Sequence, residues 1–360
     1  MQLSKDMKEK RVIITRYFEA EGSGGTTTPP VINPLNVTAN GTYNVDSGVD
    51  GFNPVVVKVP DPTPKFRSYN RTEQGEIRAS CIHNDVFYGA GYNSQNMTIF
   101  DCITETASEV SLGSSRVRNS INAWKDNLYI TSNQANIEII NTQTKVVRTV
   151  NIPFTSTTFS IIYRDALYIF APNSNLCCIF DLNTETYRMM VLLASANRFC
   201  GVVWRGNLYV HRSDTNIIDI IDLTTEKTRI VTLAAASRSN GNNIMALFHD
   251  KILIGSGVQG TGWYVVFNLL DETSINTNLQ YPFIYGLQIF RNDALIYNHS
   301  GKEIIFFSML DYTYRTYNLD VLSNLFAYNW LRWRDKMIVP ESKDIGAKIY
   351  VIDLQVQLFR

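Results

Sequence analysis

The chain has 360 residues, of which 45% are hydrophobic and 18% are charged, so it is long and apolar enough to bury a substantial core. Its 33 basic and 33 acidic side chains cancel. This balance removes the field that attracts polyphosphates and anionic membranes, and it excludes nucleic acid as the main partner.

Residues 1–33 are expected to form an extended docking segment and a flexible linker. Met1 to Lys10 is charged rather than apolar, and no later stretch approaches the roughly twenty apolar residues that cross a bilayer. We therefore expect neither a secretion signal nor membrane insertion. Arg11 to Phe18 has the pattern of a strand, and Glu21 to Pro34 has the Gly, Ser, Thr and Pro composition of a linker.

Residues 34–60 predict a small β module. Alternating apolar residues flank two turn-forming pairs, Asn40-Gly41 and Asp50-Gly51, and this is the pattern of short hairpins. Residues 61–66 follow, with prolines at 62 and 64, and we interpret them as a hinge to the rest of the chain.

From residue 67 onward the chain repeats itself. A turn residue followed by an apolar or tyrosine-bearing strand recurs at intervals of 42, 39, 41, 44, 43 and 42 residues. A second marker, an apolar run that ends in Asp, Asn or Ser, follows the first at 15 to 18 residues in every copy. The first marker lies at 84–88, 126–129, 165–168, 206–209, 250–253, 293–296 and 335–338, and the second at 99–101, 139–141, 179–181, 220–222, 266–268, 306–308 and 351–353.

This period is typical of four-stranded propeller blades, because small twisted sheets with two apolar faces must be covered by their neighbours. The sequence predicts an all-β fold in which a seven-bladed β-propeller over 67–360 follows the small module and the extended N-terminal segment. Lys65 to Tyr69 is expected to pair beside the last unit and close the ring. The predicted blades are 67–113, 114–153, 154–194, 195–235, 236–281, 282–321 and 322–360.

Large rings recur two residues before the first marker, and this repetition favours packing between blades over sugar binding. The first unit has Ile82 in this place, and the sixth shows a one-residue slip to Phe290. The regular members are Trp124, Tyr163, Trp204, Phe248 and Trp333.

The stretch from Leu35 to Val59 resembles a short module of bacteriophage tail and other virion proteins. The resemblance rests on the Val-Thr-Ala-Asn-Gly-Thr-Tyr-Asn-Val run at 37–45, the Gly-Val-Asp-Gly turn at 48–51 and the alternating strand at 55–60. Similar modules also occur on bacterial surface proteins. The propeller repeats look kelch-like in length and rhythm, but they lack the paired glycines of kelch repeats and the Gly-His and Trp-Asp pairs of the other common family.

The resemblance implies a virion protein assembled in the host cytoplasm. Its N-terminal segment would dock to other virion proteins, and its propeller would be displayed as a multimer toward a host surface glycan or protein. Two alternatives remain open: a bacterial or prophage-encoded glycan-binding adhesin, and a propeller polysaccharide hydrolase.

The chemistry-bearing residues favour structural roles, so we predict no catalytic residue, no cofactor and no metal site. The five cysteines (Cys81, Cys102, Cys177, Cys178 and Cys200) form no CxxC pair, and the four histidines (His83, His211, His249 and His299) have no metal-ligand spacing and read as turn or surface residues. The aspartates that end the second marker (Asp101, Asp181, Asp222 and Asp353) are expected to accept hydrogen bonds from turn backbone. Aromatic residues outside the repeated register remain as contact candidates: Tyr92, Trp263, Tyr281 and Trp330.

Overall fold

The chain divides into two compact units, Met1–Pro62 and Thr63–Arg360, and the boundary falls within the predicted hinge segment 61–66. The computed structural model describes residues 2–6, 11–15, 36–37, 42–44, 57–58, 66–70, 76–213, 215–237, 244–255, 264–277, 279, 284–298, 303–318, 331–340 and 348–354. Within these ranges, no helix is long and apolar enough to cross a membrane.

The described residues of the first unit form two small antiparallel sheets. β1 (Gln2–Asp6) pairs with β2 (Arg11–Thr15), and β2 lies where the sequence predicts a strand. β1 was not expected, because its charged residues show no apolar alternation. The second sheet has the order β3 (Asn36–Val37), β4 (Thr42–Asn44), β5 (Val57–Lys58), so the strands of the predicted β module do pair with one another.

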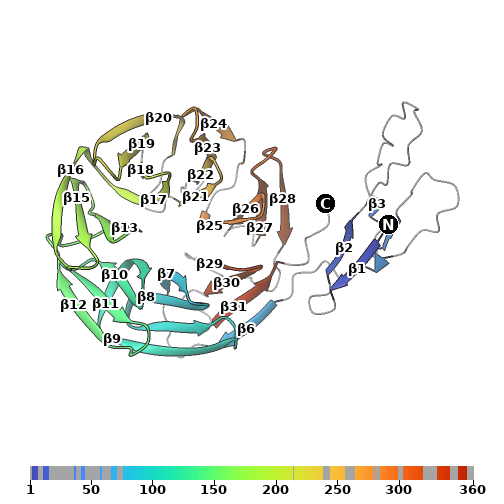
Figure 1. Cartoon of the computed structure of the whole chain (residues 1–360), viewed down its shortest axis with the longest axis horizontal. Coiled ribbons are helices and arrows are strands. Elements are labelled where there is room, and N and C mark those ends of the chain that lie inside the picture. The colour runs from blue at the N-terminus through green and yellow to red at the C-terminus, as the bar shows by residue number, and fades with distance from the viewer. Residues whose placement is uncertain are drawn as a thin grey trace. The chain divides into compact units, whose positions relative to one another are not determined.

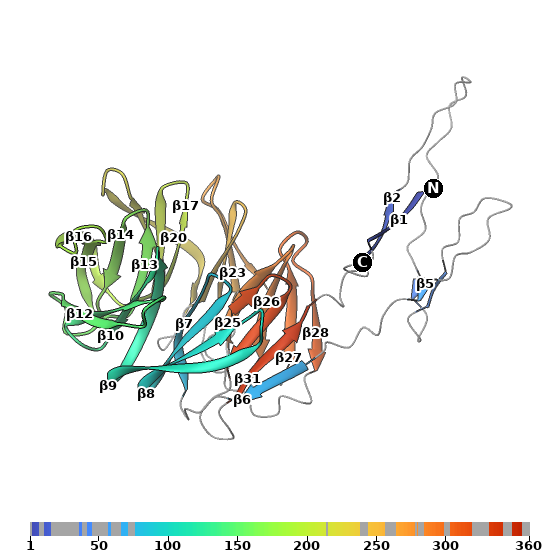
Figure 2. The ribbon, with the colours of Figure 1, turned by 60° about the horizontal axis from the view of Figure 1, so that its bottom comes forward.

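The second unit is an all-β propeller, as the repeats predict. Figure 1 looks down on the ring, with β13, β17, β21, β25 and β29 near the centre and β16, β20, β24 and β28 at the rim; Figure 2 shows the same sheets tilted. The strands are β6 (Phe66–Asn70), β7 (Ile77–His83), β8 (Val86–Asp101), β9 (Thr106–Trp124), β10 (Asn127–Ser132), β11 (Asn136–Asn141), β12 (Val147–Asn151), β13 (Phe159–Tyr163), β14 (Ala166–Phe170), β15 (Ser174–Asp181), β16 (Tyr187–Ala196), β17 (Arg198–Trp204), β18 (Asn207–Arg212), β19 (Thr215–Asp222), β20 (Thr228–Ser237), β21 (Ile244–Phe248), β22 (Lys251–Gly255), β23 (Tyr264–Asn268), β24 (Ser274–Thr277), β25 (Ile284–Phe290), β26 (Asp293–Asn298), β27 (Glu303–Ser308), β28 (Tyr314–Asn318), β29 (Leu331–Trp333), β30 (Lys336–Pro340) and β31 (Lys348–Asp353).

The described strands of the ring form six hydrogen-bonded sheets, so the prediction of seven separate sheets is wrong. Five sheets have four strands, and β7 to β12 form one sheet of six. The physical reason is β9, which runs unbroken from Thr106 to Trp124 and pairs with β8 along its first part and with β10 along its second. The predicted units 67–113 and 114–153 therefore share one sheet.

The ring closes through β6. This strand, from the start of the unit, lies beside β31 in the last sheet, with Arg67 opposite Val351 and Tyr69 opposite Ile349. The prediction that Lys65 to Tyr69 would complete the last unit is confirmed, with the strand at Phe66–Asn70. Pairing of this kind removes two sheet edges that would otherwise be exposed.

Apolar residues are buried between neighbouring sheets, as the two-faced strands require. One cluster joins Phe170 and Cys177 of the β13–β16 sheet to Leu208 and Ile221 of the next sheet. The repeated rings belong to these clusters: Phe248, Phe290 and Trp333 are buried, while Trp124, Tyr163 and Trp204 pack against clusters and are partly buried. The prediction of packing between blades is confirmed for these residues.

The slip expected in the sixth unit does not exist. Phe290 lies opposite Asp293 across its turn, just as Trp333 lies opposite Lys336 in the last sheet. In the first unit the residue in this place is His83, opposite Val86, rather than Ile82. Strand pairing therefore corrects the sequence alignment by one residue in both units.

Candidate functional site

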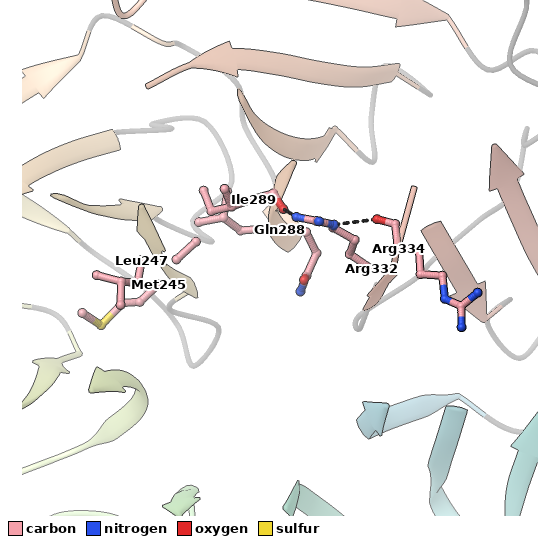
Figure 3. A pocket seen from close by; sticks show the side chains of 8 residues that line it. Met245, Leu247, Gln288, Ile289, Arg332 and Arg334 are labelled. Atoms are coloured by element: carbon pink, nitrogen blue, oxygen red, sulfur yellow. Dashed lines mark hydrogen bonds between the residues drawn. The ribbon is translucent and has the colours of Figure 1, made fainter. Parts of the chain in front are cut away.

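The innermost strands β21, β25 and β29 border a cavity of about 470 Å³ on the inner wall of the ring (Figure 3). β21 and β25 contribute mainly apolar residues, β29 contributes Arg332, and the turn after β29 contributes Arg334. The lining residues are Met245, Ala246, Leu247, Leu287, Gln288, Ile289, Arg332 and Arg334. Met245 and Leu247 pack against one apolar cluster between sheets, and Ile289 packs against the next, so the surface that borders the cavity is mostly polar.

Arg332 is held in a fixed orientation by backbone carbonyls. Its Nη1 donates to the Ile289 oxygen and its Nε donates to the Arg334 oxygen, each at 2.8 Å (Figure 3). Its guanidinium carbon lies 5.4 Å from the centre of the Phe290 ring. Arg332 is exposed, and no carboxylate of the described residues forms an ion pair with it.

Arg334, in contrast, has a carboxylate partner. Its Nη2 lies 3.2 and 3.3 Å from the two carboxylate oxygens of Asp85, which also accepts a 2.7 Å hydrogen bond from Trp333 Nε1. The Arg334 guanidinium also lies over the Trp333 ring, at 4.6 Å from its centre. Asp85 therefore balances the charge of this second arginine.

Comparison among the repeats shows that Arg332 is exceptional. It occupies the innermost-strand position next to the repeated aromatic, opposite Met337. Strand pairing identifies the corresponding residue of every other unit, and all six are apolar: Ile82, Ala123, Ile162, Val203, Leu247 and Ile289. Sequence reasoning missed this arginine, although alignment of the repeats contained the signal.

The predicted contact residues are not brought together in the described part of the structure. Tyr92 is 37% exposed, and the Arg78 guanidinium lies 4.0 Å from its ring centre. Arg78 in turn pairs with Glu76 at 2.8 Å, and none of the three lines the cavity. Trp263, Tyr281 and Trp330 lie outside the described residues.

The repeated aspartates stabilise turns, as predicted. Asp181 accepts hydrogen bonds from the backbone of Thr184 and Asn183, and these bonds hold the pKa of its carboxyl below the ordinary value. Asp101 and Asp222 make the same pair of bonds in their own turns, with the same effect on the pKa. The turn after Asp353 lies outside the described residues.

One histidine differs from expectation. His211 lies inside β18 and is fully buried rather than in a turn or at the surface, because its position in the strand faces the interior. His249 does lie in a turn and packs edge-on against Phe248, while His83 is the last residue of β7, directly before a turn. His299 lies outside the described residues.

The cysteines are free and mostly buried. Burial raises the pKa of Cys81 and Cys178 to about 12, that of Cys102 to about 11, and that of Cys177 and Cys200 as well, so these thiols stay protonated at neutral pH. Within the described ranges, no group of three or more His, Cys, Asp or Glu side chains could hold a metal ion.

Two buried arginines bind successive units together, and neither was singled out from the sequence. Arg118 donates to the carboxylate of Glu138 at 2.7 and 3.0 Å and to the Ser94 and Ser114 backbone oxygens. Arg198 repeats the arrangement with the Asp219 carboxylate, which also accepts hydrogen bonds from Arg212. Satisfied pairs of this kind fix local structure, so we assign them a structural role.

No protein-family model matches the chain, and no curated protein is significantly similar to it in sequence. Solved structures do resemble it. Virginiamycin B lyase from Staphylococcus aureus aligns with a TM-score of 0.67 and 11% identity over 81% of this chain and 100% of that one. A streptogramin B lyase structure gives a TM-score of 0.68 at 10% identity over 81% and 97%. The WD40 repeats of RRP9 give a TM-score of 0.62 at 10% identity over 81% and 97%. At this identity the likeness establishes the propeller fold alone.

Proposed function

We propose that this chain is a non-enzymatic structural protein of a bacteriophage particle, a tail-associated or head-decorating appendage that mediates host adhesion or particle assembly. The observation that carries the proposal is the two-unit organisation of the chain. The strands β3 to β5 of the first unit fall within the stretch that resembles the phage module, and the propeller begins as a separate unit at Thr63.

A separate small unit and a closed ring suit two separate functions, anchoring and recognition. The first unit would anchor the chain to other virion proteins, while the ring would present its loops and cavity toward a host surface glycan or protein, in several copies on the particle. Loops on a rigid framework are the usual place for recognition, because the framework fixes their position.

We also propose that the shared six-stranded sheet acts as two blades, which gives seven around the axis. Two observations support this count. β8 and β10 pair with different parts of β9, and the described residues form seven apolar clusters around the ring.

Particles made with and without the first unit test the proposal. We expect the full chain in purified particles at a fixed copy number, with extra density at symmetric positions in electron cryomicroscopy. A chain that begins at Thr63 should fold but be absent from particles. Absence of the full chain from particles would overturn the virion role.

The cavity supports a second candidate, a glycan-binding adhesin, and the likeness to a lyase keeps an enzymatic propeller as a third. Selective retention on a glycan array, by a chain absent from particles, would favour the adhesin. Release of new reducing ends from a polysaccharide would favour the hydrolase.

A further inference from the structure

We propose that β16 (Tyr187–Ala196) is a dimer interface, and that its free edge pairs antiparallel with β16 of a second copy of this chain. β16 is the outermost strand of its sheet and lies at the rim of the ring (Figure 1). This inference goes beyond the attachment role and does not depend on it, because the pairing can be tested in solution without particles.

One face of β16 carries four apolar side chains that the described part of the chain leaves exposed. We call them the β16 strip: Tyr187 (48% exposed), Met189 (36%), Val191 (66%) and Leu193 (56%). The intervening residues Met190 and Leu192 face the other way and are buried in the cluster with the next sheet. The strip exposes on the order of 300–400 Å², and contiguous apolar patches of this size on one chain are often functional.

The β16 strip departs from the repeat. Strand pairing identifies the residues that occupy the places of Met189 and Val191 in the fourth strand of each other unit. The five described strands that reach the place of Val191 carry polar residues there: Asn70, Ser111, Asn151, Thr232 and Asn318. At the place of Met189 the other units carry Ser68, Glu109, Thr149, Ile230, Asn276 and Thr316. Among these strands β16 alone is apolar at both places, and such a departure without a structural gain is expected at a functional site.

β16 is also an unprotected sheet edge. It pairs with β15 on one side and with no other strand among the described residues. Natural proteins blunt exposed edges with short strands, charges or prolines. The outer strands β6, β12, β24 and β28 have only four or five residues. β16 has ten, and residues 189–196 contain no charge, proline or glycine, so its edge is open to pairing with another strand.

The partner is assigned by self-complementarity. A two-fold axis at Met190 places Tyr187 opposite Leu193 of the second copy, and Met189 opposite Val191 of the second copy. Each strip residue then meets an apolar residue on the same face of the joined sheet. Arg188, the one charged residue of β16, is already paired with Glu226 of the next sheet. A two-fold dimer needs only one such self-matching surface, and it is the commonest form of homo-oligomer.

The area of the strip sets the expected strength of the dimer. The two strips bring together roughly 700 Å² of apolar surface, twice the area that one copy exposes. The paired backbone edges add to this, but the total stays near or below the roughly 1,200 Å² at which standard interfaces begin. We therefore expect a dimer that dissociates on dilution, with a dissociation constant on the order of 10–100 µM.

Sedimentation velocity of the full chain over about 1–300 µM, a range that brackets this constant, tests the dimer. We expect the sedimentation coefficient to rise with concentration from that of a monomer to that of a dimer. Val191→Lys should raise the dissociation constant at least tenfold, because a lysine on an edge strand opposes pairing. Its melting temperature should not change, because Val191 is exposed.

Ile230→Lys is the matched control. Ile230 occupies the place of Met189 in β20, a strand as long as β16, and it is 47% exposed. Thr228 and Thr232 flank it on the same face, so β20 lacks a continuous apolar strip. This variant should dimerise like the wild type.

Cross-linking tests the register of the two strands. The Met189→Cys/Val191→Cys variant should form a covalent dimer on mild oxidation with copper phenanthroline, because the two new cysteines lie opposite each other across the two-fold axis. The wild type, which carries the native cysteines alone, should stay non-covalent. Val191→Cys alone should also stay non-covalent, because its cysteine lies opposite Met189 of the second copy.

A full chain that stays monomeric at every concentration overturns the proposal in favour of a different protein as the occupant of the β16 strip. Val191→Lys that dimerises like the wild type, at the same melting temperature, overturns the assignment to β16. Equal loss in Ile230→Lys shows a nonspecific charge effect and rejects it too. A double-cysteine variant without a covalent dimer rejects the two-fold pairing. None of these outcomes bears on the virion role, which particles test separately.

Discussion

Two interfaces between neighbouring sheets of the ring, here called seams, differ in their contacts. The backbone passes directly from sheet to sheet at one seam and not at the other. At the seam between the β13–β16 and β17–β20 sheets the backbone runs directly from one sheet into the next. Ten buried apolar residues fill it, and the Arg188–Glu226 ion pair lies at its exposed rim. Apolar burial at this seam is joined by the buried Arg198, which donates to the Ser174 and Ala194 carbonyls of the preceding sheet.

The closing seam between the last sheet and the first lacks that direct connection, and its polar contacts centre on two carboxylates of the first sheet. Its apolar cluster has eight buried residues. Glu105 accepts hydrogen bonds from Arg67 at 2.7 and 2.9 Å, from Lys336 at 3.0 Å and from the Tyr69 hydroxyl, while Asp85 binds Trp333 and Arg334. Directional contacts supplement burial at both seams, but only at the closing seam does one carboxylate, Glu105, collect bonds from three side chains of the adjoining sheet.

The largest test of this comparison removes the closing strand. A chain that begins at Arg71 lacks β6 and should lose cooperative unfolding, or melt at least about 10 °C lower, because β31 gains an unpaired edge and Glu105 loses Arg67. Calorimetry would measure the change. A chain that begins at Thr63 keeps β6 and should melt like the full-length ring; equal melting of both truncations would contradict the role of β6.

A smaller effect separates the two seams by single substitutions. Glu105→Gln should lower the free energy of unfolding by about 1–3 kcal/mol, because it weakens charged hydrogen bonds at a partly buried site. Glu226→Gln removes the corresponding pair at the interior seam, where the side chains are more exposed, and should cost less than about 1 kcal/mol. Urea unfolding measures the free energy of both variants. Equal losses in Glu105→Gln and Glu226→Gln would contradict the difference between the two seams.

The smallest effect is in the pH dependence of the stability difference between the wild type and Glu105→Gln. Burial raises the pKa of Glu105, but hydrogen bonds and charge from Arg67 and Lys336 outweigh it and leave the pKa below the ordinary 4.5. The carboxylate therefore stabilises the fold fully above that ordinary value, and its contribution disappears as the pH falls through the lowered value. The gap between wild type and Glu105→Gln should narrow between about pH 5 and 3 in urea unfolding; a constant gap would contradict this origin.

The repeats were enough to predict the propeller, because turn residues and apolar strands recur with the period of a blade. They also predicted the closing strand near Lys65 to Tyr69 and the turn-stabilising role of Asp181. The number of sheets could not be predicted, because nothing in the sequence of 106–124 shows that one strand would run through two units.

The candidate site was harder to predict. Tyr92 was selected because it lies outside the repeated register; its ring contacts Arg78 and does not line the cavity at β21, β25 and β29, and its role as a contact residue stays a prediction. Arg332 lies inside the repeated register and was not predicted. It is unusual only in comparison with the apolar residues that occupy the same position in the other units. That correspondence came from strand pairing, which also removed the false slip at Phe290.

The pairing of β6 with β31 has a consequence for protein synthesis. Arg67 leaves the ribosome early, but its partner Val351 emerges only after nearly all of the unit has been translated. The ring therefore cannot close during most of translation, and the growing chain carries an unfinished last sheet. Premature termination before Lys348 would release an open ring.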